Sequence, residues 1–167
     1  MYKIEHKKKI QTFLKEIEIL KRIKHPHICN YISKYEDEKY LYLVTEYFHE
    51  GNIVTLNENL GEEDIITIVK HLANAVEYLH KLGIIHNQVK PTNVSIKTLK
   101  SGLSAKLVDF SSTMFAIENQ CIDNINSSIY YLAPEVFNNI FTLKADVWGI
   151  GLVMYYLFSK TLPFNIC

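Results

Sequence analysis

Residues 83–93, GIIHNQVKPTN, decide the fold of this chain, and residues 107–110, LVDF, follow them closely. The first stretch opens with a short apolar run, which predicts a buried strand that ends near His86. A polar segment follows, in which Lys90 stands before Pro91 and Asn93 comes two residues later. The second stretch is another apolar run, and it ends at Asp109. The pattern predicts a polar loop and an acidic residue, each at the end of a buried strand.

The composition limits what the whole chain can be. Its 167 residues are 48% hydrophobic and 22% charged, which predicts one globular domain with a buried core. Eighteen basic and eighteen acidic residues cancel, so no net field attracts nucleic acid or an acidic membrane. The three cysteines form no close pair, which favours a reducing cytosol, and we expect a cytoplasmic protein. The longest apolar run is too short to span a bilayer, so we predict neither secretion nor membrane insertion.

The first third of the chain predicts a helix and a hairpin. Between residues 10 and 23, apolar side chains recur three and four positions apart, as on one face of a helix. Pro26 should end this helix, because proline disfavours helical geometry in the residue before it. Residues 28–35 and 40–47 are strand-like, and a polar turn separates them.

The rest of the chain predicts two further helices and a strand pair. Acidic residues 62–64 favour a helix start, an apolar stripe continues to Leu79, and Gly83 suits the left-handed residue that closes many helices. Residues 94–97 and 103–108 predict a pair of short strands. Residues 145–158 are apolar on nearly all sides except at Asp146, which predicts a central buried helix rather than a surface one.

Taken in order, these stretches resemble a protein kinase. The loop resembles His-Arg-Asp-Leu-Lys-Pro-x-x-Asn, and residues 109–111 resemble Asp-Phe-Gly. The matching residues are His86, Lys90, Pro91, Asn93, Asp109 and Phe110. Residues 127–135, SSIYYLAPE, resemble the end of a kinase activation segment, and DVWGIG at 146–151 resembles the helix F region. The sequences of residues 37–47 and 130–137 most resemble those of the calcium-dependent and calmodulin-dependent serine/threonine kinases.

The resemblance implies an α+β, protein-kinase-like fold in one truncated domain, residues 1–167. Residues 1–48 would form a partial N-lobe with helix C, short antiparallel strands and the hinge. Residues 49–167 would form a partial, mostly helical C-lobe that ends after helix F. In this alignment Glu16 is the helix C glutamate, and Lys3 is the candidate for the lysine that pairs with it.

The resemblance also implies a site for ATP and Mg²⁺. Thr45 would be the gatekeeper, Glu46 to Phe48 the hinge that meets adenine, and Ser95 the position that usually supplies an apolar floor under the base. Asp109 and Asn93 would hold magnesium, because carboxylate and amide oxygens are the hard ligands that it prefers. Lys90 would steady the γ-phosphate, and Asp146 would bind the backbone of the catalytic loop.

Several positions depart from the family pattern. Gln88 replaces the catalytic aspartate, and a neutral amide cannot accept the substrate proton, a group usually worth roughly 10² to 10⁴ in rate. Asn87 replaces the arginine that reads a phosphorylated activation segment. Ser111 replaces glycine, which we expect to restrict the backbone where the family allows positive φ and to misplace Asp109. No glycine-rich phosphate loop precedes residue 10.

Three hypotheses follow. The first is a catalytically impaired pseudokinase that acts by binding a protein partner, with exposed apolar faces that could also support an oligomer. The second is an active ATP-dependent serine/threonine kinase with a protein substrate. The third is a fragment with no independent function. Taken singly, His86 could be only a packed core residue, Asn93 and Asp109 turn formers, and Glu16 a solvated helix charge.

Overall fold

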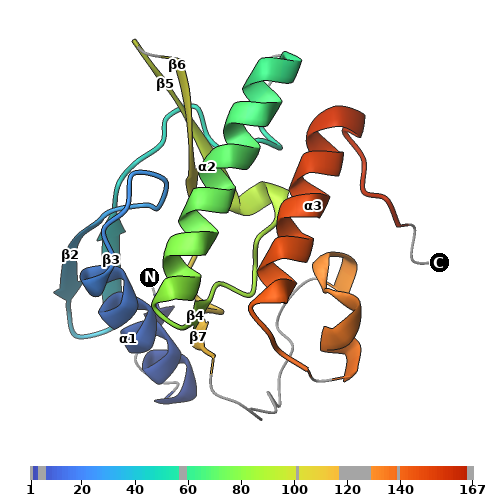
Figure 1. Ribbon diagram of the computed structural model, residues 1–167. Helices are drawn as coiled ribbons and strands as arrows, with labels where there is room; N and C mark the ends of the chain where they lie inside the picture. The colour runs from blue at the N-terminus through green and yellow to red at the C-terminus, as the bar shows by residue number, and fades with distance from the viewer. Residues whose placement is uncertain are drawn as a thin grey trace.

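The computed structural model describes residues 2–3, 7–56, 60–100, 102–116, 129–138 and 140–164, with side chains from residue 10 onward. It has the α+β, partial protein-kinase-like architecture that the sequence predicts. In Figure 1, α1 lies with β2 and β3 on the left, α2 runs through the middle, and α3 lies beside α2 on the right.

The N-terminal part is a three-stranded antiparallel sheet with one helix. Its elements are β1 (Tyr2–Lys3), α1 (Lys7–Arg22), β2 (Tyr31–Glu36) and β3 (Tyr40–Thr45), and the sheet order is β1-β3-β2. Phe13 and Ile17 of α1 bury their side chains against Leu41 of β3. The hairpin turns at Asp37, whose Oδ1 accepts hydrogen bonds from the backbone N–H groups of Lys39 and Tyr40 at 2.7 Å each. The predicted helix and hairpin are confirmed.

The central helix α2 (Glu62–Lys81) begins with acidic residues and buries one apolar face, as its sequence predicts. The carboxylate of Asp64 accepts a hydrogen bond from the backbone N–H of Gly61 at 3.1 Å, which caps the first turn. One face is buried along its whole length, through Ile65, Ile68, Leu72, Ala75, Val76 and Leu79. Gly83 ends the segment with φ of 68°, a left-handed conformation that glycine adopts without steric cost.

Two small antiparallel pairs carry the loops of the site. β4 (Ile84–Ile85) pairs with β7 (Met114–Phe115), and β5 (Val94–Leu99) pairs with β6 (Gly102–Leu107). Three short 3₁₀ turns complete the described elements: η1 (Pro91–Asn93), η2 (Ile129–Tyr131) and η3 (Pro134–Asn138). Because β6 packs on α2, the loops that follow β4 and β6 are held near each other.

The last helix, α3 (Lys144–Ser159), corrects one expectation. It packs against α2, and it buries Asp146, Gly149, Leu152, Val153 and Leu157. Its other face is not buried, since Val147 and Phe158 are 50% and 55% exposed. The prediction of a helix buried on all sides is therefore wrong: an apolar composition does not say how many faces find a partner.

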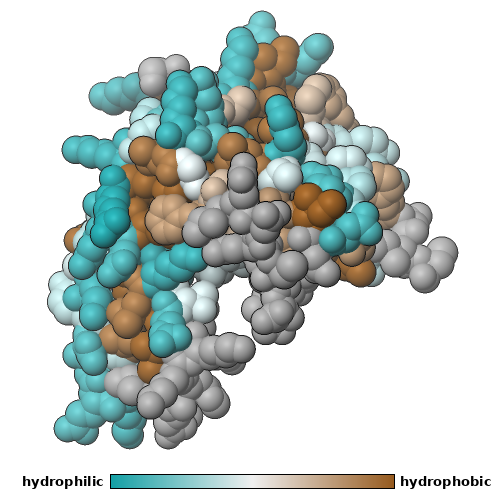
Figure 2. Space-filling model, turned by 60° about the horizontal axis from the view of Figure 1, so that its bottom comes forward, coloured by the Kyte–Doolittle hydropathy of each residue, from teal (hydrophilic) through white to brown (hydrophobic). Residues whose placement is uncertain are grey.

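Apolar side chains also reach the surface elsewhere. Figure 2 shows them in brown among hydrophilic groups on another face of the molecule. Among the described helices, none is both long and apolar enough to cross a bilayer.

Candidate nucleotide and catalytic site

A buried carboxylate on α3 shapes the loop that follows β4. Asp146 is 1% exposed, and its Oδ2 and Oδ1 accept hydrogen bonds from the backbone N–H groups of His86 and Asn87 at 2.9 and 2.8 Å. Nε2 of His80 lies 2.9 Å from the same Oδ2. Asn87 has a positive φ of 63°. The contact expected between Asp146 and the catalytic-loop backbone is thus present.

His86 is a packing residue in this loop. Its ring is fully buried, and it meets the ring of Phe110 edge to face at 4.7 Å between centroids. Its Nδ1 accepts a hydrogen bond from the backbone N–H of Gln88 at 3.3 Å. Burial lowers the pKa of His86, so the imidazole is neutral near pH 7. The structure therefore supports the interpretation of His86 as a packed core residue.

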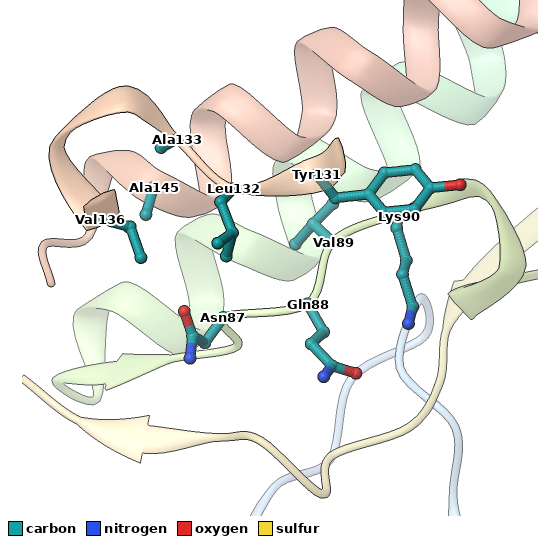
Figure 3. A pocket seen from close by; sticks show the side chains of 9 residues that line it. All are labelled: Asn87, Gln88, Val89, Lys90, Tyr131, Leu132, Ala133, Val136 and Ala145. Carbon is teal, nitrogen blue, oxygen red and sulfur yellow. The ribbon is translucent and has the colours of Figure 1, made fainter. Parts of the chain in front are cut away.

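The loop presents Gln88, Lys90 and Asn93 in one region. Asn93 is 5% exposed, and its Nδ2 donates to the backbone carbonyl of Gln88 at 3.1 Å. Its Oδ1 accepts a long hydrogen bond from the hydroxyl of Thr92 at 3.5 Å, and its second lone pair can meet a cation. Figure 3 shows the side chains of Gln88 and Lys90 pointing to the same side of the loop, while Leu132 and Val136 lie on the other side. The space on that second side is about 20 Å³, enough for one water.

Asp109 lies in a tight turn after β6. The backbone N–H of Val108 donates to the carbonyl of Asn93 at 3.0 Å, which joins this turn to the catalytic loop. Asp109 is exposed and has φ of 63°, and its Oδ1 accepts hydrogen bonds from the N–H and the hydroxyl of Ser111 at 3.2 and 2.6 Å.

The expectation about Ser111 needs correction. Ser111 is not among the residues with positive φ; the left-handed residue of this turn is Asp109 itself. The serine therefore meets no steric conflict from its side chain, and its hydroxyl adds a donor to the carboxylate. Sequence reasoning missed this role because it assigned the unusual backbone conformation to the wrong residue.

One cavity of about 270 Å³ brings three predicted residues together. Glu16, Thr45 and Asp109 line it. The other lining residues are Phe13, Leu20, Cys29, Leu43, Val108 and Ser111. Cys29 was not predicted as a lining residue, and burial raises the pKa of its thiol to about 12, so it is not a nucleophile near pH 7. Its only sequence signal is its place in the apolar run that follows Pro26.

The electrostatics of this cavity favour a cation. Glu16 is 9% exposed, and its pKa is raised to about 7 by burial first and then by the nearby negative charge of Asp109. Glu16 is therefore not the solvated charge of the alternative interpretation. Lys3 lies in β1 opposite Tyr40, and its side chain is outside the described atoms, so the Lys3–Glu16 ion pair stays a prediction.

Glu46 of the predicted hinge lies beside a separate hollow. The backbone N–H of Glu46 donates to the carbonyl of Asn30 at 2.9 Å, and its Oε2 lies 2.6 Å from Nζ of Lys106. Nζ of Lys97 is 3.8 Å from Oε1 of the same carboxylate. Glu46, Lys97 and Lys106 line a hollow of about 550 Å³, and none of them lines the cavity with Asp109. Sequence reasoning missed both lysines. For Lys106, the available signal was its place inside the apolar run LSAKLV.

The two other predicted adenine contacts are packed into the structure. Phe48 is half-buried and packs against the main core. Ser95 is 7% exposed and lies opposite Lys106 in the β5–β6 register. A small polar side chain thus stands where the family pattern usually has an apolar floor under the base.

The chemistry of two oxygen donors is of the kind that magnesium prefers. The carboxylate of Asp109 and Oδ1 of Asn93 are hard oxygen ligands on two turns that share a backbone hydrogen bond. A cation there would offset the repulsion between Asp109 and Glu16. When bound, magnesium neutralises charge on the phosphates of the nucleotide.

Comparison with known proteins agrees with this geometry. Calcium-dependent protein kinase 4 of Plasmodium berghei is 31% identical, over 97% of this chain and 31% of that protein. The protein of the same name from Plasmodium falciparum is 30% identical over the same shares. A serine/threonine-protein kinase of Drosophila simulans is 33% identical, over 89% of this chain and 21% of that protein. The chain thus spans about a third or less of the length of these relatives. A family model described as protein kinase domain matches residues 1–166, and the chain therefore belongs to the protein kinase family.

Proposed function

We propose that this chain is a protein-kinase-like domain that keeps the framework of an ATP and Mg²⁺ site, transfers phosphate poorly or not at all, and acts through a protein partner. The observation that carries the proposal is Gln88. It stands at the loop position of the catalytic aspartate, and its backbone is held by His86 and Asn93. A neutral amide there cannot take up the proton of a substrate hydroxyl, which lowers the rate by roughly 10² to 10⁴.

The other predicted residues have assigned roles in this proposal. Asp109 and Asn93 hold the metal, and Lys90 places a positive charge near the transferred phosphate. The adenine contacts are Thr45, the backbone of Glu46 to Phe48, and Ser95. Lys3 is the candidate partner of Glu16.

The second candidate is an active serine/threonine kinase with a protein substrate. Lys90 and Asn93 lie in one loop, and the backbone hydrogen bond from Val108 to Asn93 joins the turn of Asp109 to it, which favours this candidate. The names of the relatives agree with that specificity. Both candidates bind the nucleotide, and they differ only in whether the phosphate moves.

The proposal extends to organisation and location. The N-lobe part at residues 1–48 and the C-lobe part at residues 49–167 act as one unit, and the exposed apolar residues of α3, such as Val147 and Phe158, supply contact surface for a partner or an oligomer. A cytoplasmic location is supported by Cys29, which is a free thiol.

The test compares three variants with the native chain: Gln88→Asp, Gln88→Asn and Asp109→Asn. Asparagine and aspartate differ only in the amide, so Gln88→Asn controls for the shorter side chain. We expect ATP and Mg²⁺ at roughly 100 times Kd to raise the thermal midpoint of the native chain by about 5 °C or more, and Asp109→Asn to abolish the shift. Transfer of labelled phosphate to a basic peptide should rise about 10²-fold or more in Gln88→Asp alone.

Two outcomes would overturn this proposal in different ways. Transfer by the native chain at about 1 to 100 per second, lost in Asp109→Asn, would show a working kinase. The absence of a nucleotide-dependent shift in every variant would remove the nucleotide site and leave a binding domain or a fragment.

A further inference from the structure

Three histidines gather where the loop after α1 crosses α2 and β6. The rings of His27 and His71 are stacked, with centroids 3.7 Å apart and planes inclined by 17°. His25 meets the edge of His27 at 5.6 Å and stacks on Tyr78 of α2 at 5.0 Å. We call His25, His27 and His71 the histidine cluster.

The backbone of Ala105 in β6 fixes which nitrogen carries hydrogen in two of these rings. Its carbonyl oxygen lies 3.2 Å from Nδ1 of His27, and a carbonyl only accepts, so this Nδ1 carries a hydrogen. Its N–H donates to Nδ1 of His71 at 3.3 Å, so that nitrogen must present a lone pair. His71 is therefore neutral, with its hydrogen on Nε2.

His25 is under the same constraint. Its Nδ1 accepts a hydrogen bond from the backbone N–H of His27 at 3.2 Å. A proton added to His25 or His71 would occupy the accepting nitrogen and remove the bond. His25 and His71 can therefore keep these hydrogen bonds only in the uncharged form.

The same loop is attached to both neighbouring elements. The backbone N–H of Leu107 in β6 donates to the carbonyl of His27 at 2.9 Å, and the backbone N–H of Lys24 donates to the hydroxyl of Tyr78 at 3.2 Å. The loop begins where α1 ends, and α1 carries Glu16 into the cavity with Asp109. The histidine cluster therefore lies at the joint between α1 and the rest of the molecule.

Charged groups around the cluster oppose protonation. Lys106 of β6 is the nearest cation, with Lys97 on β5 beside it, and the carboxylate of Glu46 after β3 is already paired with both. From α2 the facing titratable groups are His71 and Tyr78. Burial is the main cause that lowers the pKa of each of the three histidines, and Lys106 lowers those of His25 and His27 further.

We propose that the histidine cluster is a pH-sensitive joint, which in its neutral form holds the loop after α1 on α2 and β6, and which on protonation releases that loop and loosens α1. The unfolded chain binds protons near pH 6.5, whereas the folded cluster binds them at lower pH. Its contribution to stability is therefore complete above about pH 6.5 and is lost as the pH falls. Each histidine can change the unfolding constant by up to about tenfold per pH unit in that range.

The experiment measures urea unfolding between pH 5 and 8 for the native chain, His71→Asn, His27→Asn and His49→Asn. Asparagine offers an accepting oxygen and a donating nitrogen near the place of Nδ1 and does not titrate. We expect His71→Asn to remove up to about tenfold per pH unit of the acid dependence below pH 6.5. His27→Asn should act in the same direction. His49→Asn is the control outside the cluster: the His49 side chain is 69% exposed and lies 3.2 Å from Oε1 of Glu50, and losing an exposed pair of this kind should change the profile much less than His71→Asn does.

A second measurement uses the native chain alone, so that a variant that fails to fold does not decide the question. As the pH falls from 7 to 5, the hydrogen-exchange protection factor of the Ala105 amide should drop, while that of Val108, bound to Asn93, should hold. The proposal is overturned if His71→Asn keeps the native pH dependence, or if the Ala105 amide stays protected while NMR shows His71 charged.

Discussion

The predicted catalytic loop at residues 86–93 and the turn at residues 109–111 are linked by the backbone hydrogen bond from Val108 to Asn93, but they are stabilised in different ways. The loop is tied to the rest of the chain by Asp146, a buried carboxylate some 60 positions away. In the turn, the ring of Phe110 is buried in the core, but the side chains of Asp109 and Ser111 hydrogen-bond to each other nearer the surface. The difference indicates that Asp146 holds the folding core together, whereas the Asp109–Ser111 contact can change with effects mainly on ligand binding.

The largest expected effect comes from removing the anchor of the loop. Asp146→Ala leaves the N–H groups of His86 and Asn87 buried without an acceptor, and we expect it to lower the free energy of unfolding by about 3 to 5 kcal/mol. Urea denaturation measures this change. Asp37→Ala is the matched control, because Asp37 also accepts hydrogen bonds from two backbone N–H groups, and from the Tyr42 hydroxyl, but lies at an exposed turn, so it should cost much less than Asp146→Ala. Similar losses in the two variants would contradict the distinction.

A smaller effect should follow from crowding the loop against α3. A Cβ on Gly149 would lie 2.5 Å from the carbonyl oxygen of Val89, whereas a Cβ on Gly151 would meet nothing within 4 Å. Gly149→Ala should destabilise the chain by about 1 to 3 kcal/mol, because backbone must move to make room. Gly151→Ala should stabilise it by up to about 1 kcal/mol through helix propensity. The two alanine variants, compared by thermal unfolding, differ only in this contact, and equal midpoints would argue against it.

The smallest effect on stability is expected at the turn. Ser111→Ala removes one exposed hydrogen bond to Asp109, so the free energy of unfolding should change by about 0.5 kcal/mol or less. The Mg²⁺ concentration that gives half of the ATP-dependent thermal shift should instead rise about threefold or more, because the carboxylate loses its nearest donor. Ser111→Thr keeps the hydroxyl and should behave like the native chain. A loss of stability as large as that of Gly149→Ala would place the Asp109–Ser111 contact in the folding core after all.

Features that depend on neighbours in sequence were predictable. The periodicity of α1 and α2 located both helices, and the resemblance of the loop to the kinase pattern identified Gln88, Lys90 and Asn93 as the residues to examine. The outer face of α3 was not predictable, because a helix that is apolar all round carries no periodicity to show which side lacks a partner.

Contacts between distant positions were also out of reach. The ring of His71 stacks on that of His27 because β6 packs on α2. Glu46 contacts Lys106 because the β5–β6 hairpin lies beside the segment that follows β3. No local sequence pattern predicts either contact. The role of Ser111 depended on which residue of its turn is left-handed, and the backbone decides that.

The positive φ of Asn87 has a bearing on how this loop tolerates its altered composition. Asparagine is several-fold enriched in the left-handed region relative to most residues, because its short side chain can hydrogen-bond to the local backbone there. The arginine of the family pattern has no such relief at a dihedral of this kind. Asparagine at this position therefore carries a smaller conformational penalty at the bend than arginine would, which helps the loop to keep its shape without the cation.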